Sequence, residues 1–320
     1  MENGRQVVVI ARVLLPAGRE PLEERFEVRQ GGLDCSREHL LEIVPGANAL
    51  VPDSSIAIDA GLLDACGDGL RVVANFAVGY DNVDLDACRE RSVIVTNTPG
   101  VLTEATAELA LALTLAAGRR MGDAERDLRE GFWRGWDPAA YRGIEIRGAT
   151  VGVVGMGRIG SRYAELVHGM GAAVLYAGPN SKPDAERDLG ARQVDLDELL
   201  EASDVVSIHA PARPDTRGLI GARELELIGP SGVLVNTARG PLVDVEALAP
   251  ALKSGALGAA GLDVYPNEPE VPASLLDAPR CVLLPHIGSA TVKARDAMAR
   301  TVADNVIAVL EGQEPPNRVV

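Results

Sequence analysis

The segment from Thr150 to Gly160 constrains this 320-residue chain more than any other. An apolar run, Val151–Val154, leads directly into the turn Gly155-Met156-Gly157-Arg158-Ile159-Gly160, and a second apolar run, Ala172–Ala177, follows at the distance that a βαβ unit requires. In such a turn the first glycine allows a tight bend, the second lets the backbone approach a pyrophosphate, and the third lets the following helix pack on the strand. Gly-x-Gly-x-x-Gly alone is weak evidence in a chain with 34 glycines. A plain βα turn is the alternative, but the flanking strand and helix favour a dinucleotide-binding unit.

Two series of alternating apolar and amphipathic segments run along the chain. In the first, strands are expected near Val7–Ala11, Ala49–Val51, Arg71–Asn75 and Val93–Thr96. In the second, they are expected near Val151–Val154, Val174–Tyr176, Val205–Ile208, Val233–Asn236, Gly261–Val264 and Val282–Leu284. Strands that alternate with helices predict parallel sheets. The fold class is therefore α/β, with a Rossmann-type doubly wound parallel sheet of six strands and a smaller α/β domain.

Three further segments connect or close these series. A long apolar helix is expected over about Thr103–Ala117, and its Ala/Leu run is too short and too flanked by charge to span a membrane. The stretch Glu130–Gly148 carries both tryptophans and several turn residues, which is typical of a connecting arm. A last helix, about Val292–Glu311, has nothing left to extend in the second sheet and is expected to return to the first domain.

The composition excludes several classes of protein. The net charge of −15 and the pI near 4.8 argue against binding to nucleic acid or to an anionic membrane surface. The four cysteines form no C-x-x-C pair and lie near no histidine cluster, so a reduced, cytoplasmic protein without a metal site is expected. The N-terminus shows no signal-peptide pattern. Any anionic ligand must therefore meet a locally positive site.

Polar side chains follow three strands of the second series at the point where each strand ends. These are Arg239, Glu268 and His286. Ligands of open α/β sheets bind beyond the carboxyl ends of the strands, so the three are expected to converge. A cation that anchors a carboxylate, an imidazolium that donates a proton and a carboxylate that orients the imidazole are the groups needed to reduce a 2-keto acid. Each residue alone has a structural alternative, but their joint placement beside a dinucleotide turn favours chemistry.

With these residues in place, the chain resembles the D-isomer-specific 2-hydroxyacid dehydrogenase family over essentially its whole length. The segments that carry the resemblance are the Gly-rich turn, Asn75-Phe-Ala-Val-Gly-Tyr-Asp-Asn-Val-Asp84, Thr96-Asn-Thr-Pro-Gly100, Asn236-Thr-Ala-Arg-Gly-Pro-Leu-Val-Asp244, Gly261-Leu-Asp-Val-Tyr-Pro-Asn-Glu-Pro269 and Leu284-Pro-His-Ile-Gly-Ser-Ala-Thr291. The resemblance implies that residues 1–100 and 289–320 form a flavodoxin-like substrate (catalytic) domain. It implies that residues 101–288 form the dinucleotide-binding domain.

The resemblance also implies roles for individual residues. Arg239, Glu268 and His286 match the catalytic trio of the family. Backbone N–H groups of Val78 and Gly79 would bind the substrate carboxylate, together with Arg239. Asp263 falls where the family contacts the nicotinamide carboxamide. The other positions expected to line the cofactor are Thr106, Gly155, Met156, Gly157, Arg158, Ile159, Gly160, His209, Pro211, Thr237, Ala238 and Gly288.

Within the family, the quoted segments and the arm Trp133-Arg-Gly-Trp-Asp-Pro138 resemble the glyoxylate/hydroxypyruvate reductase branch. The implied reaction is hydride transfer from NAD(P)H to a small 2-keto acid. D-lactate-type and D-3-phosphoglycerate-type dehydrogenases stay open as alternatives, because substrate pockets are loosely encoded. A nucleotide-sensing corepressor-like binding protein is an alternative from a different class.

The stretch after the strand Val174–Tyr176 bears on the choice of nicotinamide cofactor. An NAD site normally places Asp or Glu at the end of this strand, where the adenosine ribose is bound. Gly178 stands there instead, and Asn180, Ser181 and Lys182 offer donors and one positive charge. This pattern favours NADPH. NADH stays the alternative, because NADP-using relatives often carry an arginine where this chain has Pro179.

The arm resembles a segment that crosses to a second subunit in this branch, so a homodimer is expected. Trp136 in the arm would then either reach the active site of the partner as a substrate-binding residue or simply pack at the interface. The sequence favours neither of these two roles.

Overall fold

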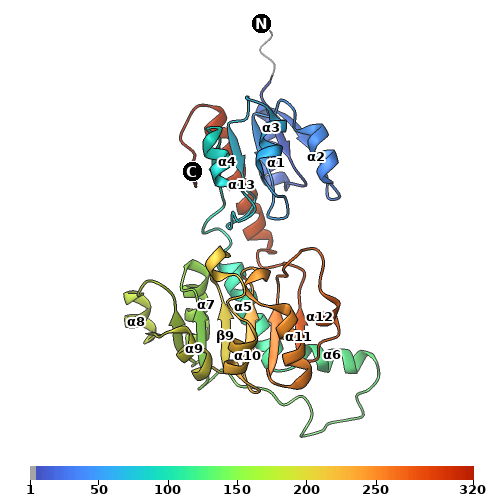
Figure 1. Cartoon of the computed structure of the whole chain (residues 1–320), viewed down its shortest axis with the longest axis vertical. Coiled ribbons are helices and arrows are strands. Elements are labelled where there is room, and N and C mark those ends of the chain that lie inside the picture. The colour runs from blue at the N-terminus through green and yellow to red at the C-terminus, as the bar shows by residue number, and fades with distance from the viewer. Residues whose placement is uncertain (1–4) are drawn as a thin grey trace. The chain divides into compact units, whose positions relative to one another are not determined.

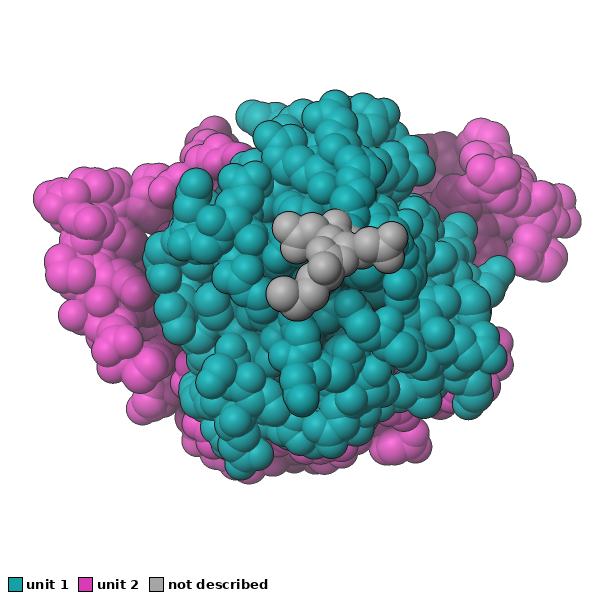
Figure 2. Space-filling view, turned by 90° about the horizontal axis from the view of Figure 1, so that it is seen from above, with its two compact units in different colours: residues 1–102, 289–320 teal, residues 103–288 magenta. Residues whose placement is uncertain are grey.

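The computed structural model describes residues 5–320, and the chain divides into two compact units. One unit extends to Leu102 and resumes at Ser289–Val320, and the other is Thr103–Gly288 (Figure 2). Each unit is built on one sheet in which every paired strand is parallel, with helices on both faces (Figure 1). The predicted α/β class is confirmed.

The sheet of the first unit has the strand order β2-β1-β3-β4-β5, which is the flavodoxin-like order. Its strands are β1 (Val7–Ile10), β2 (Glu27–Gln30), β3 (Ala49–Val51), β4 (Val72–Ala74) and β5 (Ile94–Thr96). The three central strands are short runs that are buried on both faces, as a sheet covered on both sides requires.

Two layers of helices cover this sheet. On one face, α1 (Pro16–Arg25) and α13 (Val292–Leu310) bury Leu22, Val302 and Val306 against the strands. On the other face lie α2 (Arg37–Ile43), α3 (Ala60–Cys66) and α4 (Leu85–Glu90), which bury Leu40 and Leu62. The last helix of the chain therefore belongs to the first unit.

The sheet of the second unit has the order β12-β11-β10-β9-β6-β7-β8. This is a doubly wound arrangement, in which the strand order, and not the strand direction, reverses between β6 and β9. Its strands are β6 (Thr150–Val154), β7 (Ala173–Ala177), β8 (Arg192–Gln193), β9 (Val205–Ile208), β10 (Val233–Asn236), β11 (Ala259–Leu262) and β12 (Cys281–Leu283). The carboxyl ends of β6, β9, β10, β11 and β12 therefore share one edge, where ligands of such sheets bind.

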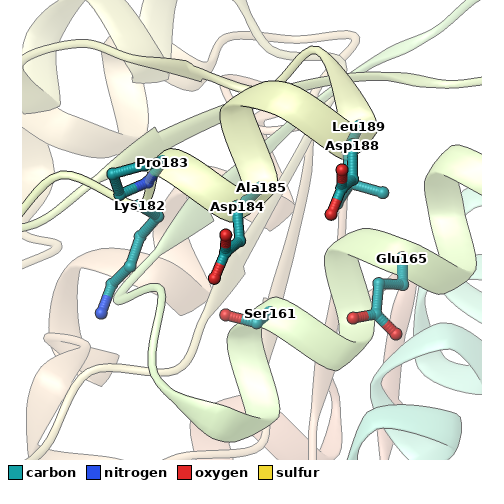
Figure 3. Close-up of a pocket in the computed structure, with 8 residues that line it drawn as sticks. All are labelled: Ser161, Glu165, Lys182, Pro183, Asp184, Ala185, Asp188 and Leu189. Atoms are coloured by element: carbon teal, nitrogen blue, oxygen red, sulfur yellow. The ribbon is translucent and has the colours of Figure 1, made fainter.

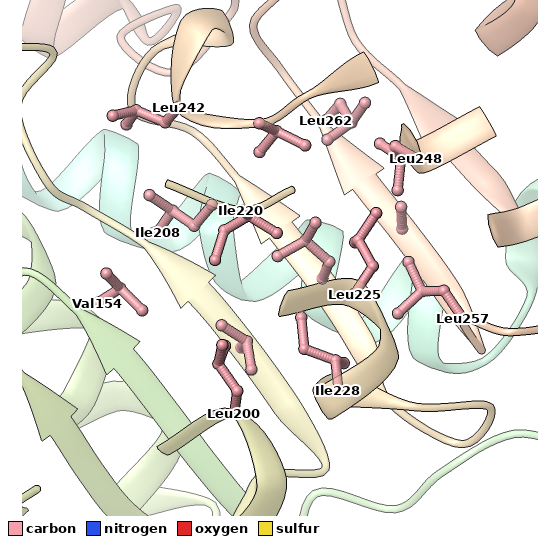
Figure 4. Packing of buried hydrophobic residues seen from close by; sticks show 14 of the residues in the cluster. Val154, Leu200, Ile208, Ile220, Leu225, Ile228, Leu242, Leu248, Leu257 and Leu262 are labelled. Carbon is pink, nitrogen blue, oxygen red and sulfur yellow. The ribbon is translucent and has the colours of Figure 1, made fainter. Parts of the chain in front are cut away.

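Two hydrophobic clusters hold helices on the two faces of this second sheet. One cluster packs α5 (Thr103–Gly118), α7 (Arg158–Gly169) and α8 (Pro183–Leu189) onto the sheet. The other packs α9 (Leu196–Ala202), α10 (Ala222–Ile228) and α11 (Val245–Ser254) onto it; Figure 4 shows Leu200, Leu225 and Leu248 from these three helices. The remaining helical segments are α6 (Met121–Arg129), η1 (Pro214–Thr216), η2 (Gly240–Leu242) and α12 (Ala273–Leu276). Across residues 5–320, no helix is long and apolar enough to cross a membrane.

The structure differs from the sequence-based expectation in three strands. β2 and β8 were not predicted, because their residues are polar and largely exposed edge positions without an apolar run. β11 begins at Ala259, two residues before the expected start, because Ala259 and Ala260 are buried small residues that carry a weak strand signal. The two sheets consequently have five and seven strands instead of four and six.

Candidate active site

The Gly-rich turn joins β6 to α7. Gly155 has a φ of +94°, and a Cβ atom there would lie 2.7 Å from the backbone nitrogen of Ala210. A Cβ atom on Gly160 would lie 2.2 Å from the carbonyl oxygen of Gly155, whereas Gly157, at the N-terminus of α7, faces open space. The first and third glycines are thus required by the protein itself. The second leaves room for a ligand at the positive N-terminal end of a helix of 12 residues.

The side chains in this turn differ in their surroundings. Met156 is buried, and both Met156 and Ile159 pack in the core between α5, α7 and the sheet. Arg158 is exposed at the first position of α7. A ligand in this turn would therefore meet Met156 and Ile159 through their backbone, and Arg158 through its guanidinium as well.

His286 and Glu268 form a close pair beyond the ends of β11 and β12. The Nδ1 atom of His286 lies 2.5 Å from Oε2 of Glu268, and Oε1 of Glu268 accepts a 2.9 Å hydrogen bond from the N–H of Tyr265. Burial opposes ionisation of Glu268, but the bonds from His286 and Tyr265 outweigh it, so the pKa of Glu268 lies below its usual range. The imidazole is therefore oriented by an ionised carboxylate, with about a third of each side chain exposed.

The turn that carries His286 is fixed by Asp263, which is fully buried. Its two oxygens accept bonds from the N–H groups of Ile287 at 2.8 Å and Gly288 at 2.7 Å, while its carbonyl accepts the N–H of His286 at 2.9 Å. Thr106 of α5 donates from Oγ1 to the carbonyl of Gly288 at 3.1 Å. His286 itself has a φ of +54°, a left-handed conformation that costs free energy for a residue with a side chain. Asp263 and Thr106 thus hold a strained turn in place.

Arg239 lies in the turn that follows β10. The side chain of Asn236 brackets this turn: it donates to the carbonyl of Arg239 at 2.9 Å and accepts the N–H of Ala238 at 3.0 Å. The positive charge of Arg239 also contributes to the lowered pKa of Glu268, which places it near the His286–Glu268 pair. Thr237 in the same turn is buried, and its hydroxyl has no partner within residues 5–320. An unsatisfied buried hydroxyl is expected to bind a ligand or a water molecule.

The loop after β7 is held by three hydrogen bonds. The hydroxyl of Tyr176 accepts the N–H of Lys182 at 2.9 Å and donates to Glu186 at 2.5 Å. Gln193 donates to the carbonyl of Gly178 at 2.8 Å. Asn180 and Ser181, between these two anchor points, are exposed. The loop is therefore fixed at both ends and open in the middle.

A groove of about 480 Å³ lies beside this loop, between α7 and α8 (Figure 3). It is lined by Ser161, Glu165, Lys182, Pro183, Asp184, Ala185, Asp188 and Leu189. The three carboxylates are each paired with an arginine: Glu165 with Arg162, and both aspartates with Arg187. In the part of the chain that the structure describes, Lys182 has no carboxylate as an ion-pair partner. Its positive charge is therefore available beside the groove.

His209 and Pro211 follow β9, next to the Gly-rich turn. The N–H of His209 donates to the carbonyl of Val154 at 2.7 Å, and its Nε2 lies 2.9 Å from Oγ of Ser207. The ring of Tyr163 lies 5.1 Å from the imidazole, centroid to centroid. Burial lowers the pKa of His209 to about 3, so its ring is neutral. The His209 side chain supports the turn from within, and Pro211 is exposed.

In the first unit, the predicted carboxylate-binding residues Val78 and Gly79 lie in the loop that follows β4. The side chain of Asn97 donates to the carbonyl of Val78 at 2.7 Å, and that of Asn75 donates to the carbonyl of Gly79 at 2.8 Å. Both loop residues are half-buried. The loop is therefore ordered by the side chains of two asparagines that directly follow β4 and β5.

The comparisons with known proteins identify the family. Residues 111–288 match the family model described as "D-isomer specific 2-hydroxyacid dehydrogenase, NAD binding domain". A glyoxylate reductase from Thermococcus litoralis is 42% identical over 318 residues, which cover 98% of this chain and 96% of the relative. The chain belongs to the D-isomer-specific 2-hydroxyacid dehydrogenase family. Its similarity to reductases of this name places it in the glyoxylate reductase branch, as the sequence predicted.

Solved structures agree with this family assignment. A protein from Thermus thermophilus superposes with a TM-score of 0.92 at 44% identity, covering 98% of this chain and all of the other. An NADPH-dependent glyoxylate/hydroxypyruvate reductase from Sinorhizobium meliloti, solved with NADP and malonate, has a TM-score of 0.87 at 35% identity. That match covers 99% of this chain and 97% of the reductase.

The arm of this family member, after α6, exposes large apolar side chains. Trp136 is 86% exposed, and Phe132 and Trp133 are each more than half exposed, as is Leu128 near the end of α6. The base of the arm is anchored, since the hydroxyl of Tyr141 donates to Asp127 at 2.6 Å. An anchored base with exposed aromatic side chains is typical of a surface that another chain covers.

Sequence analysis missed several residues that shape this family member's candidate site. Asn75, Asn97, Tyr176 and Glu186 hold loops through their side chains. Asn75 and Asn97 lie in segments that carry the family resemblance, but no role was predicted for their side chains, and Tyr176 and Glu186 belong to no motif. The available signal for the two asparagines is their position directly after apolar strand runs. Their specific partners could not be read from the sequence, because each bond joins a residue to a neighbouring loop.

Proposed function

We propose that this protein reduces a small 2-keto acid, glyoxylate or hydroxypyruvate, to the 2-hydroxy acid with a nicotinamide cofactor. The observation that carries the proposal is the 2.5 Å pair of His286 and Glu268 at the same sheet edge as the Gly-rich turn. Curated relatives named glyoxylate reductase support the substrate class. With hydroxypyruvate, the expected product is the D-2-hydroxy acid.

The residues present fit a dinucleotide. The open space at Gly157, the uncapped N-terminus of α7 and the unpartnered Thr237 hydroxyl are features that a bound pyrophosphate and ribose would satisfy. When bound, the nicotinamide supplies the hydride. We assign the remaining predicted positions, including Ala238, His209, Pro211, Asp263, Thr106 and Gly288, to the support or lining of this site. We also assign residues 101–288 to cofactor binding and residues 1–100 with 289–320 to substrate binding.

His286 would be the proton donor. Because Nδ1 is engaged by Glu268, Nε2 is the nitrogen that passes a proton to the carbonyl oxygen as hydride arrives at the carbon. Glu268 keeps the imidazole oriented and favours its protonated form. Arg239 would bind the carboxylate and carbonyl oxygens of the substrate through a planar fork of N–H donors. In the first unit, the N–H groups of Val78 and Gly79 are assigned to binding of a substrate carboxylate.

The cofactor would be NADPH in preference to NADH. Lys182, which has no ion-pair partner among residues 5–320, and the exposed Asn180 and Ser181 would supply a cation and donors for a 2′-phosphate. The reductase from Sinorhizobium meliloti, which is described as NADPH-dependent, supports this choice. NADH is the alternative, because no arginine stands at Pro179.

The protein would act as a homodimer, with the exposed aromatic arm as part of the interface. Trp136 would either complete the substrate site of the partner or pack between the subunits. Sedimentation velocity on the purified protein tests the dimer directly.

A panel of glyoxylate, hydroxypyruvate, pyruvate and 3-phosphohydroxypyruvate, each assayed with NADPH and with NADH, tests the function. Preference for pyruvate would indicate the D-lactate type, and preference for 3-phosphohydroxypyruvate the D-3-phosphoglycerate type. No oxidation of either cofactor, with tight binding of a dinucleotide, would favour the corepressor-like alternative.

A further inference from the structure

The loop that follows β4 has three successive carbonyl groups fixed by hydrogen bonds. The carbonyl of Ala77 accepts the N–H of Thr98 at 3.0 Å. The carbonyls of Val78 and Gly79 accept the side-chain amides of Asn97 at 2.7 Å and Asn75 at 2.8 Å. Two of the three donors are therefore side chains that a single substitution can remove.

The direction of each N–H group follows from these bonds. Within a trans peptide, the N–H of one residue points opposite to the carbonyl of the residue before it. The N–H groups of Val78, Gly79 and Tyr80 therefore point away from the donors that hold the preceding carbonyls. Val78 and Gly79 are half-buried and Tyr80 is exposed, so this loop is partly accessible to a ligand. Backbone N–H groups held in this way form an anion-binding surface.

Asn97 is held in place by the C-terminal part of the chain. Its N–H donates to the carbonyl of Asn317 at 3.3 Å, and its carbonyl accepts the side-chain amide of Asn305 at 3.3 Å. Asn305 is fully buried on α13, and its Oδ1 accepts the N–H of Asn317 at 3.1 Å. A continuous set of hydrogen bonds thus runs from α13 through Asn97 to the peptide between Val78 and Gly79.

We propose that Asn97 is a positioning residue for the substrate carboxylate, an inference that rests on the proposed function. It donates to the Val78 carbonyl and so turns the Gly79 N–H outward, toward an anion. Without this donor, the peptide can rotate and present its carbonyl oxygen, whose partial negative charge repels a carboxylate. Asn75 acts in the same way on the next peptide, and Asn305 keeps Asn97 in its orientation.

The test compares Asn97→Leu with Asn48→Leu. Leucine has nearly the shape of asparagine but no donor. Asn48 is a matched control, because it is half-buried in the same unit and also bonds backbone groups, donating to Gly69 and accepting from Val7. Asn97→Leu should raise the KM for glyoxylate roughly tenfold, the scale of one charge-assisted hydrogen bond, with kcat and the KM for NADPH within about twofold. Asn48→Leu should change none of the three.

A second readout separates positioning from general loosening of the fold. Glyoxylamide carries the reacting carbonyl but no carboxylate, so the ratio of kcat/KM for glyoxylate to that for glyoxylamide should fall roughly tenfold in Asn97→Leu only. An unchanged ratio would overturn the proposal. If Asn97→Leu melts well below wild type, Asn97→Ser serves instead, because its shorter hydroxyl cannot reach the Val78 carbonyl.

Oxalate binding, measured by calorimetry, distinguishes failure of this inference from failure of the proposed function. If wild type reduces no keto acid but binds oxalate, and Asn97→Leu binds it at least tenfold more weakly, the proposed function fails and the anion site stands. Equal oxalate affinity in the two proteins overturns the role of Asn97, whatever the activity. A wild type that neither reduces keto acids nor binds oxalate overturns both.

Discussion

The Nδ1 atom of His286 lies 2.5 Å from Oε2 of Glu268, and the other oxygen of this carboxylate is held by the N–H of Tyr265. Both oxygens therefore have fixed partners, and the imidazole is held in one orientation. Because the pKa of Glu268 is lowered, the carboxylate is ionised at neutral pH and places a negative charge beside the imidazole. This pair makes the pH dependence of reduction the most direct test of the site.

Glu268→Gln should shift the alkaline limb of the pH–rate profile for keto acid reduction to lower pH. The amide carries no charge, so a positive imidazole would lose the negative charge that Glu268 places beside it. The profile of kcat/KM from pH 5 to 9 measures the shift. His286→Ala should lower kcat by roughly a hundredfold or more at every pH. A Glu268→Gln profile that coincides with wild type would remove Glu268 from this role.

Arg239→Lys should lower kcat/KM for the keto acid by more than tenfold, although the charge is kept. A guanidinium binds two oxygens through a planar fork, whereas an ammonium acts as a single point charge. The KM for the cofactor should stay close to that of wild type. Wild-type kcat/KM in Arg239→Lys would assign substrate binding to another residue.

Asp263→Asn should lower kcat by roughly tenfold or more, because the amide nitrogen cannot accept the N–H bond that one carboxylate oxygen accepts now. The strained turn at His286 then loses part of its support. Thr106→Val should also lower kcat, but by a smaller factor, since it removes only the bond to the Gly288 carbonyl. Thr114→Val, at another buried hydroxyl of α5, is the control and should leave kcat unchanged. Equal effects of Thr106→Val and Thr114→Val would point to general damage to α5.

The elements that the sequence predicted well are those with strong local signals. Val151–Val154 and the glycines after it define a strand, a turn and a helix through backbone requirements that are local in the chain. Arg239, Glu268 and His286 could be expected to converge because each follows a strand of one parallel sheet. The predicted start of β11 was wrong by two residues. Ala259 and Ala260 have little strand propensity, and they belong to the strand because they pair with β10.

Contacts made across the chain could not be predicted in the same way. The β2 strand is polar and becomes a strand only because β1 offers an unpaired edge. The predicted contact of Asp263 with the nicotinamide stays a prediction. Its support of the turn that holds His286 was not predicted, because that role depends on a neighbour 24 residues away in sequence. The bonds from Asn97 to Val78 and from Asn305 to Asn97 likewise join distant residues, 19 and 208 positions apart.

Trp136→Ala should change the ratio of kcat/KM values for glyoxylate and hydroxypyruvate more than it changes the KM for NADPH. The reason is that Trp136 is 86% exposed on the arm and is therefore available to a second subunit. Trp133→Ala, at a neighbouring exposed tryptophan, is the matched control for the loss of an aromatic side chain. A protein that is monomeric and fully active at assay concentration would exclude this role for Trp136.

The cofactor preference should depend on Lys182. Lys182→Ala should raise the KM for NADPH by roughly five- to tenfold and leave the KM for NADH unchanged, because only NADPH carries a 2′-phosphate for the ammonium group to bind. Lys253→Ala is the control, since this lysine is exposed at the end of α11 and distant in sequence from the loop. Arg187→Ala should weaken the binding of NADPH as well. It would leave the carboxylates of Asp184 and Asp188 unpaired beside the groove, where their negative charges repel a phosphate. Parallel measurements of kcat/KM with NADPH and with NADH test whether this loop selects the 2′-phosphate. A wild type that prefers NADH would show that it does not. A Lys182→Ala variant with an unchanged KM for NADPH would show the same.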